Sequence, residues 1–141
     1  MATTRTAKAH WEGSLFDGSG QVSLESSGLG TFDVNWPSRA EEAAGKTSPE
    51  ELIAAAHSTC FSMAFSKALA DAGHAPQRLD TSADVTFQPG EGITGIKLTV
   101  RGQVEGIDAE QFGSLAEDAK KNCPVSQALA GTTITLEASL A

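Results

Sequence analysis

The sequence predicts an α+β fold, with strands and helices segregated along the chain. Three observations support this class. The first 36 residues hold short alternating runs separated by glycine turns, the middle of the chain has one long helical period, and the second half begins with a predicted β-hairpin. Segregation of this kind is typical of α+β proteins, whereas α/β proteins alternate the two elements. A length of 141 residues is expected to form one domain, residues 1–141.

Three short strands are predicted in the N-terminal part. Thr6–Glu12 and Gln21–Ser26 alternate small or apolar residues with polar ones, and Asp17–Gly20 between them has the composition of a turn. Thr31–Trp36 alternates in the same way and is expected to end at the proline that follows. The polar segment after it, Ser38–Thr47, is expected to be a loop.

The strongest local signal is a long helix. Ser48 reads as its N-cap, Pro49 as its first residue and Glu51 as the acidic partner of a capping box, while Gly73 is the expected stop. Apolar residues recur at helical spacing, and two phenylalanines are expected near the polar face, so the helix is predicted to be central and covered by several neighbours. The recurring positions are Leu52, Ile53, Ala56, Cys60, Met63, Ala64, Ala68 and Leu69, and the two phenylalanines are Phe61 and Phe65.

The rest of the chain predicts a hairpin, two further helices and a closing strand. The hairpin turn is Pro89–Gly92, and Gly131 ends the last helix. The expected elements are strands at Leu79–Gln88 and Ile93–Val104, helices at Asp108–Lys121 and Cys123–Ala130, and a strand at Thr132–Ser139.

Composition excludes several classes of function. Acidic residues outnumber basic ones by 18 to 10, and the formal net charge of −8 argues against nucleic acid or an anionic membrane as a partner. No apolar run is long enough to span a bilayer, and the N-terminus lacks the apolar stretch of a signal peptide. We therefore expect a cytoplasmic protein in a reducing compartment. Two cysteines are too few for a disulfide scaffold or a four-cysteine zinc site, and no metal site is predicted.

The two thiols, Cys60 and Cys123, lie 63 residues apart, so the sequence does not say whether they meet. Cys60 lies on the apolar side of the long helix, where a free cysteine commonly behaves as a small hydrophobic residue. Cys123 precedes Pro124 at a helix start, where the positive end of the helix stabilises a thiolate. Local physical chemistry therefore favours Cys123 as the more acidic thiol.

Three other residues are candidates for chemistry. His57 is three residues before Cys60, which allows a Cys–His nucleophile pair, although a structural helix histidine is the simpler interpretation. Arg39 is followed by Glu41 and Glu42, which is typical of an exposed ion-pair surface. Glu50 is not needed for the capping box and is therefore free for another role.

Two segments carry a family resemblance: Ser48–Ala64, with the sequence SPEELIAAAHSTCFSMA, and Cys123–Ser126, with the sequence CPVS. Together they resemble the OsmC/Ohr family of thiol peroxidases. The resemblance implies an intertwined α+β homodimer with antiparallel sheets packed on a long central helix, active sites at the subunit interface, and no cofactor. By position, it implies that Cys60 is the peroxidatic nucleophile and Cys123 the resolving thiol.

The resemblance also implies roles for Glu50 and Arg39, of which the arginine matches the OsmC branch. The Ohr branch places its arginine nearer the N-terminus, and Leu15–Gln21 holds none here. Arg39 would hold Cys60 as a thiolate, and Glu50 would fix the guanidinium by a bidentate pair. The expected substrates are organic hydroperoxides, and also hydrogen peroxide; the organic ones are favoured because apolar residues including Leu52, Phe61, Met63 and Phe65 surround Cys60. The expected reductant is an external dithiol of the lipoyl type.

One geometric question follows. In a straight helix Glu50 lies about 15 Å along the axis from Cys60, too far for one arginine to reach both within a protomer. Either two such helices pack antiparallel near Ala54–Ala56 in a dimer, or the helix is kinked. Two other functions stay open from the residues: a stress-induced dimeric binding protein with cysteines used only for packing, and a Cys–His hydrolase using His57.

Overall fold

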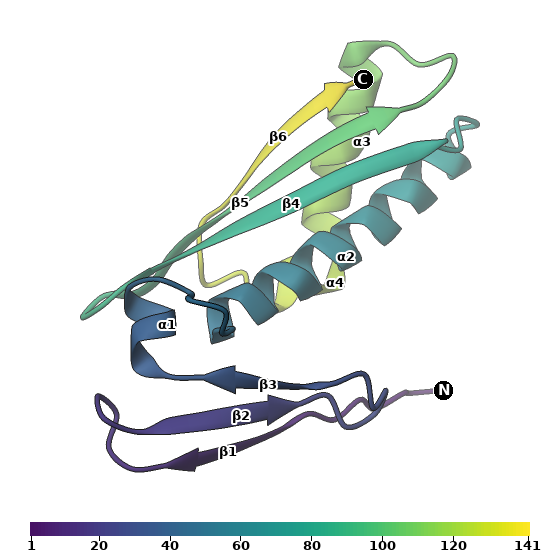
Figure 1. The fold of residues 1–141 in the computed structure, drawn as a ribbon. Coiled ribbons are helices and arrows are strands. Elements are labelled where there is room, and N and C mark those ends of the chain that lie inside the picture. The colour runs from purple at the N-terminus through teal and green to yellow at the C-terminus, as the bar shows by residue number, and fades with distance from the viewer. The chain divides into compact units, whose positions relative to one another are not determined.

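The computed structural model describes residues 1–141, which form two compact units, residues 1–52 and 53–141. The first unit contains the antiparallel sheet β1-β2-β3, made of β1 (Lys8–Glu12), β2 (Ser19–Ser23) and β3 (Thr31–Val34) (Figure 1). The three predicted strands are present, with shorter bounds than expected. Only Ser38 and Glu50 are almost fully buried in this unit, so its sheet has no apolar core of its own.

Helix α1 (Trp36–Ala40) occupies a stretch that was predicted to be the end of a strand and a loop. Its start is a capping box: the Asn35 side chain accepts from the Ser38 backbone N–H at 2.8 Å, and the Asn35 backbone N–H donates to the Ser38 hydroxyl at 3.2 Å. Pro37 fits because the first turn of a helix needs no N–H from it. The predicted loop is therefore wrong at this point, and Arg39 lies on a helix.

Helix α2 (Pro49–Asp71) begins and ends where the sequence predicts. The Ser48 hydroxyl accepts from the Glu51 N–H at 3.2 Å, but the Glu51 carboxylate binds the Thr47 hydroxyl instead of closing the capping box. At the other end Gly73 has a φ of +87°, and the His74 N–H reaches the Leu69 carbonyl at 2.8 Å. This is the glycine-ended motif expected of a helix C-terminus.

The buried face of α2 differs from the predicted one. His57, Phe61, Phe65 and Leu69 recur every four residues and are completely buried, whereas Met63 is 69% exposed. Phe61 and Phe65 therefore belong to the core, where the Phe65 ring packs 5.0 Å from that of Phe112. The prediction that they lie near the polar face is wrong because the exposed side of α2 carries other residues, among them Thr59, Met63 and Lys67.

The second unit carries the sheet β4-β5-β6, made of β4 (Arg78–Gln88), β5 (Gly92–Gln103) and β6 (Ile134–Leu140). Helices α3 (Ala109–Asn122) and α4 (Pro124–Ala128) connect β5 to β6 (Figure 1). The β4–β5 pair is antiparallel, as predicted for a hairpin, but β6 runs parallel to β5. The expectation of purely antiparallel sheets is wrong here, because the two intervening helices return the chain to the end where β5 began.

The core of the second unit lies between α2, α3 and one face of β5. Leu98 and Val100 alternate along β5 and point to that face, where they meet the α2 phenylalanines and Phe112 of α3. Gly102 is buried against Phe112, whose ring would lie 2.8 Å from any added Cβ. This close packing fixes α2 and α3 on the same sheet, and both cysteines are carried by elements anchored to it.

Candidate active site

Cys60 and Cys123 meet in the second unit. Cys60 lies midway along α2, and Cys123 lies at the junction where α3 ends and α4 begins. The Cys123 N–H donates to Ala119 at 2.9 Å, and its carbonyl accepts from Gln127 at 3.0 Å, so one residue closes one helix and opens the next. Both cysteines are free, and their thiols lie close enough together for Cys123 to act on the pKa of Cys60.

The two thiols differ in access. Cys123 is completely buried and belongs to the apolar core, whereas Cys60 is half-buried. A cleft of about 580 Å³ opens beside Cys60 and does not reach Cys123. Its lining comes from α2, α3 and the start of α4: Cys60, Met63, Ala64, Lys67, Ala68, Asp71, Asp118, Ala119, Asn122 and Pro124. Phe61, Phe65 and Leu52 do not line it, so that part of the predicted apolar surrounding is wrong.

The surroundings of Cys60 act on its pKa in opposite directions. Burial raises the pKa of the Cys60 thiol, and the neighbouring Cys123 thiol raises it further, whereas the Val125 backbone N–H lowers it by donating to the sulfur. The N–H groups at the start of α4 were expected to favour Cys123, but Cys123 makes no side-chain capping bond. The first turn of α4 therefore serves Cys60.

His57 makes a buried link to Ser126. The His57 Nε2 and the Ser126 Oγ lie 2.7 Å apart, with exposures of 0% and 5%. Desolvation lowers the pKa of His57, so the imidazole is neutral at physiological pH. The ring thus pairs with a serine of α4, and the geometry gives no support to the Cys–His pair. The sequence does not single out Ser126, because its partner is 69 residues away.

Arg39 and Glu50 form a bidentate ion pair in the first unit. The Arg39 Nε lies 3.0 and 3.2 Å from the two Glu50 carboxylate oxygens, and its Nη2 lies 3.0 Å from Oε2. The Glu50 side chain is 8% exposed and that of Arg39 is 31% exposed. The pair is therefore largely buried, unlike the exposed surface that the flanking glutamates suggest. Glu41 and Glu42 are exposed instead.

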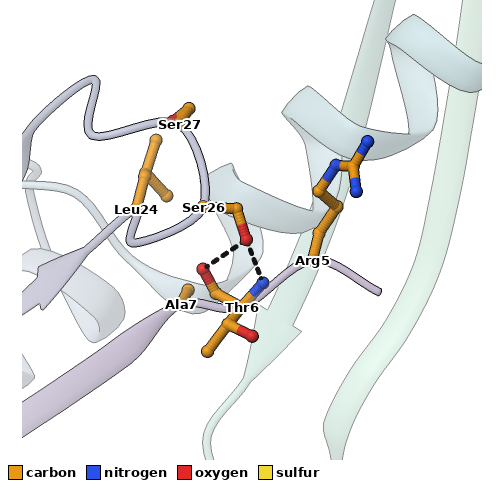
Figure 2. A pocket seen from close by; sticks show the side chains of 6 residues that line it. All are labelled: Arg5, Thr6, Ala7, Leu24, Ser26 and Ser27. Atoms are coloured by element: carbon orange, nitrogen blue, oxygen red, sulfur yellow. Dashed lines mark hydrogen bonds between the residues drawn. The ribbon is translucent and has the colours of Figure 1, made fainter. Parts of the chain in front are cut away.

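A second cleft, of about 380 Å³, lies in the first unit. Figure 2 shows its Ser26 hydroxyl held by the Thr6 backbone, with the amide N at 2.6 Å. Arg5 is the one ionisable side chain that lines this cleft, and no thiol or imidazole lines it. It offers no chemistry comparable to that beside Cys60. Elsewhere, no group of three or more His, Cys, Asp or Glu side chains is placed to hold a metal ion. None of the helices combines the length and apolar character that a membrane crossing requires.

Known proteins resemble this chain in sequence over three quarters of its length or more. It is 44% identical over 143 residues to the peroxiredoxin OsmC of Escherichia coli K12, covering 99% of both chains. It is also 33% identical over 111 residues to the organic hydroperoxide resistance protein OhrA of Bacillus subtilis 168, covering 75% of this chain and 78% of that one.

Solved structures have the same fold. An OsmC-like protein from Mycoplasma pneumoniae matches with a TM-score of 0.73 at 13% identity, covering 99% of both chains. An organic hydroperoxide resistance protein OsmC from Legionella pneumophila matches with a TM-score of 0.68 at 23% identity, covering 100% of this chain and 98% of that one. A family model described as OsmC-like protein matches residues 41–137. With its α+β fold, two sheets and long helix, the chain belongs to the OsmC family.

Proposed function

We propose that this protein is a cysteine-based peroxidase that reduces hydroperoxides. The observation that carries the proposal is the contact between two free thiols of unequal access, of which only Cys60 borders a cleft. The kinship with a peroxiredoxin and with an organic hydroperoxide resistance protein supports the same chemistry.

The reaction follows from this arrangement. The Cys60 thiolate attacks one peroxide oxygen, the O–O bond breaks, and the alcohol leaves after taking up a proton, so that Cys60 becomes a sulfenic acid. The Cys123 thiol then attacks the Cys60 sulfur, the S–O bond breaks, and the hydroxyl leaves as water with the Cys123 proton. Thiols already in contact make this second step effectively unimolecular. An external dithiol of the lipoyl type would return both thiols to the reduced state.

Arg39 and Glu50 are proposed to activate Cys60. A peroxidatic cysteine reacts as a thiolate, but burial and Cys123 both raise the pKa of the Cys60 thiol. A guanidinium beside the sulfur would counter this and would polarise the peroxide. Glu50 fixes that guanidinium through the bidentate pair. Glu50 and Cys60 are ten residues apart on α2, about 15 Å along the axis, so we propose that Arg39 of one protomer serves Cys60 of a second.

Homodimer formation is proposed on independent grounds. A three-stranded sheet without a buried apolar side chain is not expected to be stable alone. The first unit exposes large apolar side chains, and α2 exposes Ala55, Ala56 and Met63. Exposed apolar surface of this extent is typical of an interface, and we propose that a second copy of the chain packs against it. The exposed large side chains of the first unit are Trp11, Leu15, Phe16, Leu29 and Phe32, besides Met1. We propose, by the same kinship, one domain over residues 1–141 and a cytoplasmic location.

Peroxide titration tests the activity. Reduced protein is mixed with an equimolar amount of cumene hydroperoxide, and free thiols and intact mass are followed. We expect both thiols and the mass of two hydrogens to be lost, and Cys60→Ser to abolish the loss. Unchanged thiols would contradict the peroxidase and favour a binding protein.

Mixed dimers test the sharing of sites. Arg39→Met and Cys60→Ser chains should each be inactive alone, and they are unfolded and refolded together. If Arg39 serves the partner's thiol, the mixture regains activity, because a chain with Cys60 receives Arg39 from the other chain. If the mixture stays inactive, each protomer uses its own arginine.

A further inference from the structure

The buried link between His57 and Ser126 joins the two cysteine-bearing elements. His57 lies three residues before Cys60 on α2, and Ser126 lies three residues after Cys123 on α4. The 2.7 Å contact between Nε2 and Oγ therefore joins the same two segments as the contact between the two thiols. On each segment, the residue that makes it is three residues from the cysteine. The peroxidase chemistry above gives this link no role.

The imidazole is a costly choice for this position. Its Nδ1 is buried without any hydrogen-bond partner, and an unsatisfied buried polar atom is destabilising. An apolar side chain of similar size would fill the same space in the stripe of Phe61, Phe65 and Leu69 without that cost. What an apolar side chain would not provide is the hydrogen bond to Ser126.

Helix α4 needs such an anchor because it is very short. Its five residues, Pro124–Ala128, form about 1.4 turns at about 3.6 residues per turn, and a helix this short is marginal without tertiary contacts. Yet its first turn performs two tasks at Cys60. It carries Cys123 as its N-cap residue, which places the Cys123 thiol, and it directs the Val125 N–H to the Cys60 sulfur. Both tasks need the turn to be held against α2 with little freedom.

We infer that His57 and Ser126 are positioning residues that hold the first turn of α4 so that Cys123 closes rapidly onto oxidised Cys60. The inference rests on the proposed function. Neither residue touches the peroxide in this scheme, so the first step should depend on them little. The second step should depend on them strongly, and a slow second step leaves the sulfenic acid exposed to further peroxide and to conversion into sulfinic acid.

The test separates the two steps in Ser126→Ala. After one addition of cumene hydroperoxide, samples are quenched with a thiol alkylator and dimedone, and the reduced, sulfenic, disulfide and sulfinic species are counted by mass. We expect the loss of reduced Cys60 to stay at the wild-type rate. Disulfide formation should slow about five- to tenfold, the effect of losing about one hydrogen bond, and sulfinic acid should accumulate under excess peroxide.

Matched variants distinguish positioning from general damage. Ser126→Thr keeps the hydroxyl and should retain the wild-type ratio of the two rates, and His57→Leu should behave like Ser126→Ala. Ser114→Ala changes an exposed serine of α3 and should alter neither step. Circular dichroism confirms that each variant is folded. Equal slowing of both steps, or a wild-type disulfide rate in both Ser126→Ala and His57→Leu, would overturn the inference.

A second assay avoids peroxide altogether. Oxidised glutathione converts the Cys60 thiolate to a mixed disulfide and releases one glutathione, and Cys123 then displaces the second. The displacement should slow in Ser126→Ala by the same factor as with peroxide. If wild-type protein does not react with peroxide but Ser126→Ala shows the slower displacement of glutathione, the proposed function fails while the positioning role stands. If the displacement is unaffected, the positioning role fails whatever happens with peroxide.

Discussion

Removing the Arg39 guanidinium should destabilise the protein more than removing the Glu50 charge. Glu50 is 6% exposed, and its two carboxylate oxygens accept three hydrogen bonds from Arg39. In Arg39→Met the carboxylate stays buried without that partner. In Glu50→Gln the arginine keeps an amide oxygen as acceptor, and its side chain, 31% exposed, retains access to water.

Breaking a fully buried ion pair on one side costs about 3–5 kcal/mol. Because water reaches about a third of the Arg39 side chain, we reduce this to about 2–3 kcal/mol for Arg39→Met. Glu50→Gln should cost about 1 kcal/mol, the value of an ordinary hydrogen bond. The double variant Arg39→Met/Glu50→Gln should be more stable than Arg39→Met, because its buried group is no longer charged.

Urea unfolding at pH 7.5 measures these differences. With a slope of about 1–3 kcal/mol per molar urea, Arg39→Met should lower the midpoint by about 1 M. All variants must be compared at one protomer concentration, because the stability of the proposed dimer would depend on concentration. Arg101→Met, which changes an exposed arginine of β5, is the matched control and should leave the midpoint unchanged. A loss below about 0.5 kcal/mol in Arg39→Met would refute the reasoning and make the pair an ordinary surface ion pair.

Three further predictions concern the thiols, the buried histidine and the core. Cys123→Ser should lose one thiol to equimolar peroxide and gain the mass of two oxygens on Cys60 under excess peroxide; a stable Cys60 thiol would contradict its assignment as nucleophile. Burial lowers the pKa of His57 from 6.5, so His57 takes up a proton at a higher pH in the unfolded chain than in the folded protein. The free energy of unfolding that is present above pH 6.5 should therefore decrease as the pH drops through the folded pKa. In urea titrations, His57→Gln should lack the part of the pH-dependent loss of stability that His57 causes. Identical pH profiles for His57→Gln and the wild type would exclude this contribution of His57. Phe65→Ala should cost about 3–5 kcal/mol in the same assay, because its ring is completely buried against Phe112; a cost under about 1 kcal/mol would mean that this core is not packed as described.

The long helix was predictable because both of its ends are encoded locally. Ser48 and Gly73 act within one turn of the helix, and each works through backbone geometry that a single residue controls. Its buried face was not predictable in the same way, because apolar and small residues surround most of the helix. Only the tertiary partners decide that Phe61 is enclosed and Met63 exposed. Helix α1 was missed although Asn35 and Ser38 carry a capping box, because five residues are too few to show a period.

The site was predictable only in part, because its contacts join distant segments. The resemblance to a family paired Cys60 with Cys123, and the structure brings their thiols into contact. The sequence alone predicts that the N-terminus of α4 stabilises the Cys123 thiolate, but the N–H groups of a helix start act on whichever side chain lies opposite them. The sulfur opposite the Val125 N–H belongs to α2, which local sequence does not reveal.

Under the proposed function, the difference in access between the thiols also means that the order in which they react does not depend on which is intrinsically more acidic. A peroxide entering the cleft meets Cys60, while Cys123 is completely buried behind it. Even a highly nucleophilic Cys123 would have no substrate until its neighbour had been oxidised. In the proposed reaction, the burial of Cys123 therefore leaves the first step to Cys60, and the closeness of the two thiols gives the second step to Cys123. Only the pKa of the Cys60 thiol then needs to be lowered. That sulfur is the one whose pKa is raised by burial and by Cys123, and in the proposed function the Arg39 guanidinium, held by the buried Glu50 carboxylate, would counter this rise.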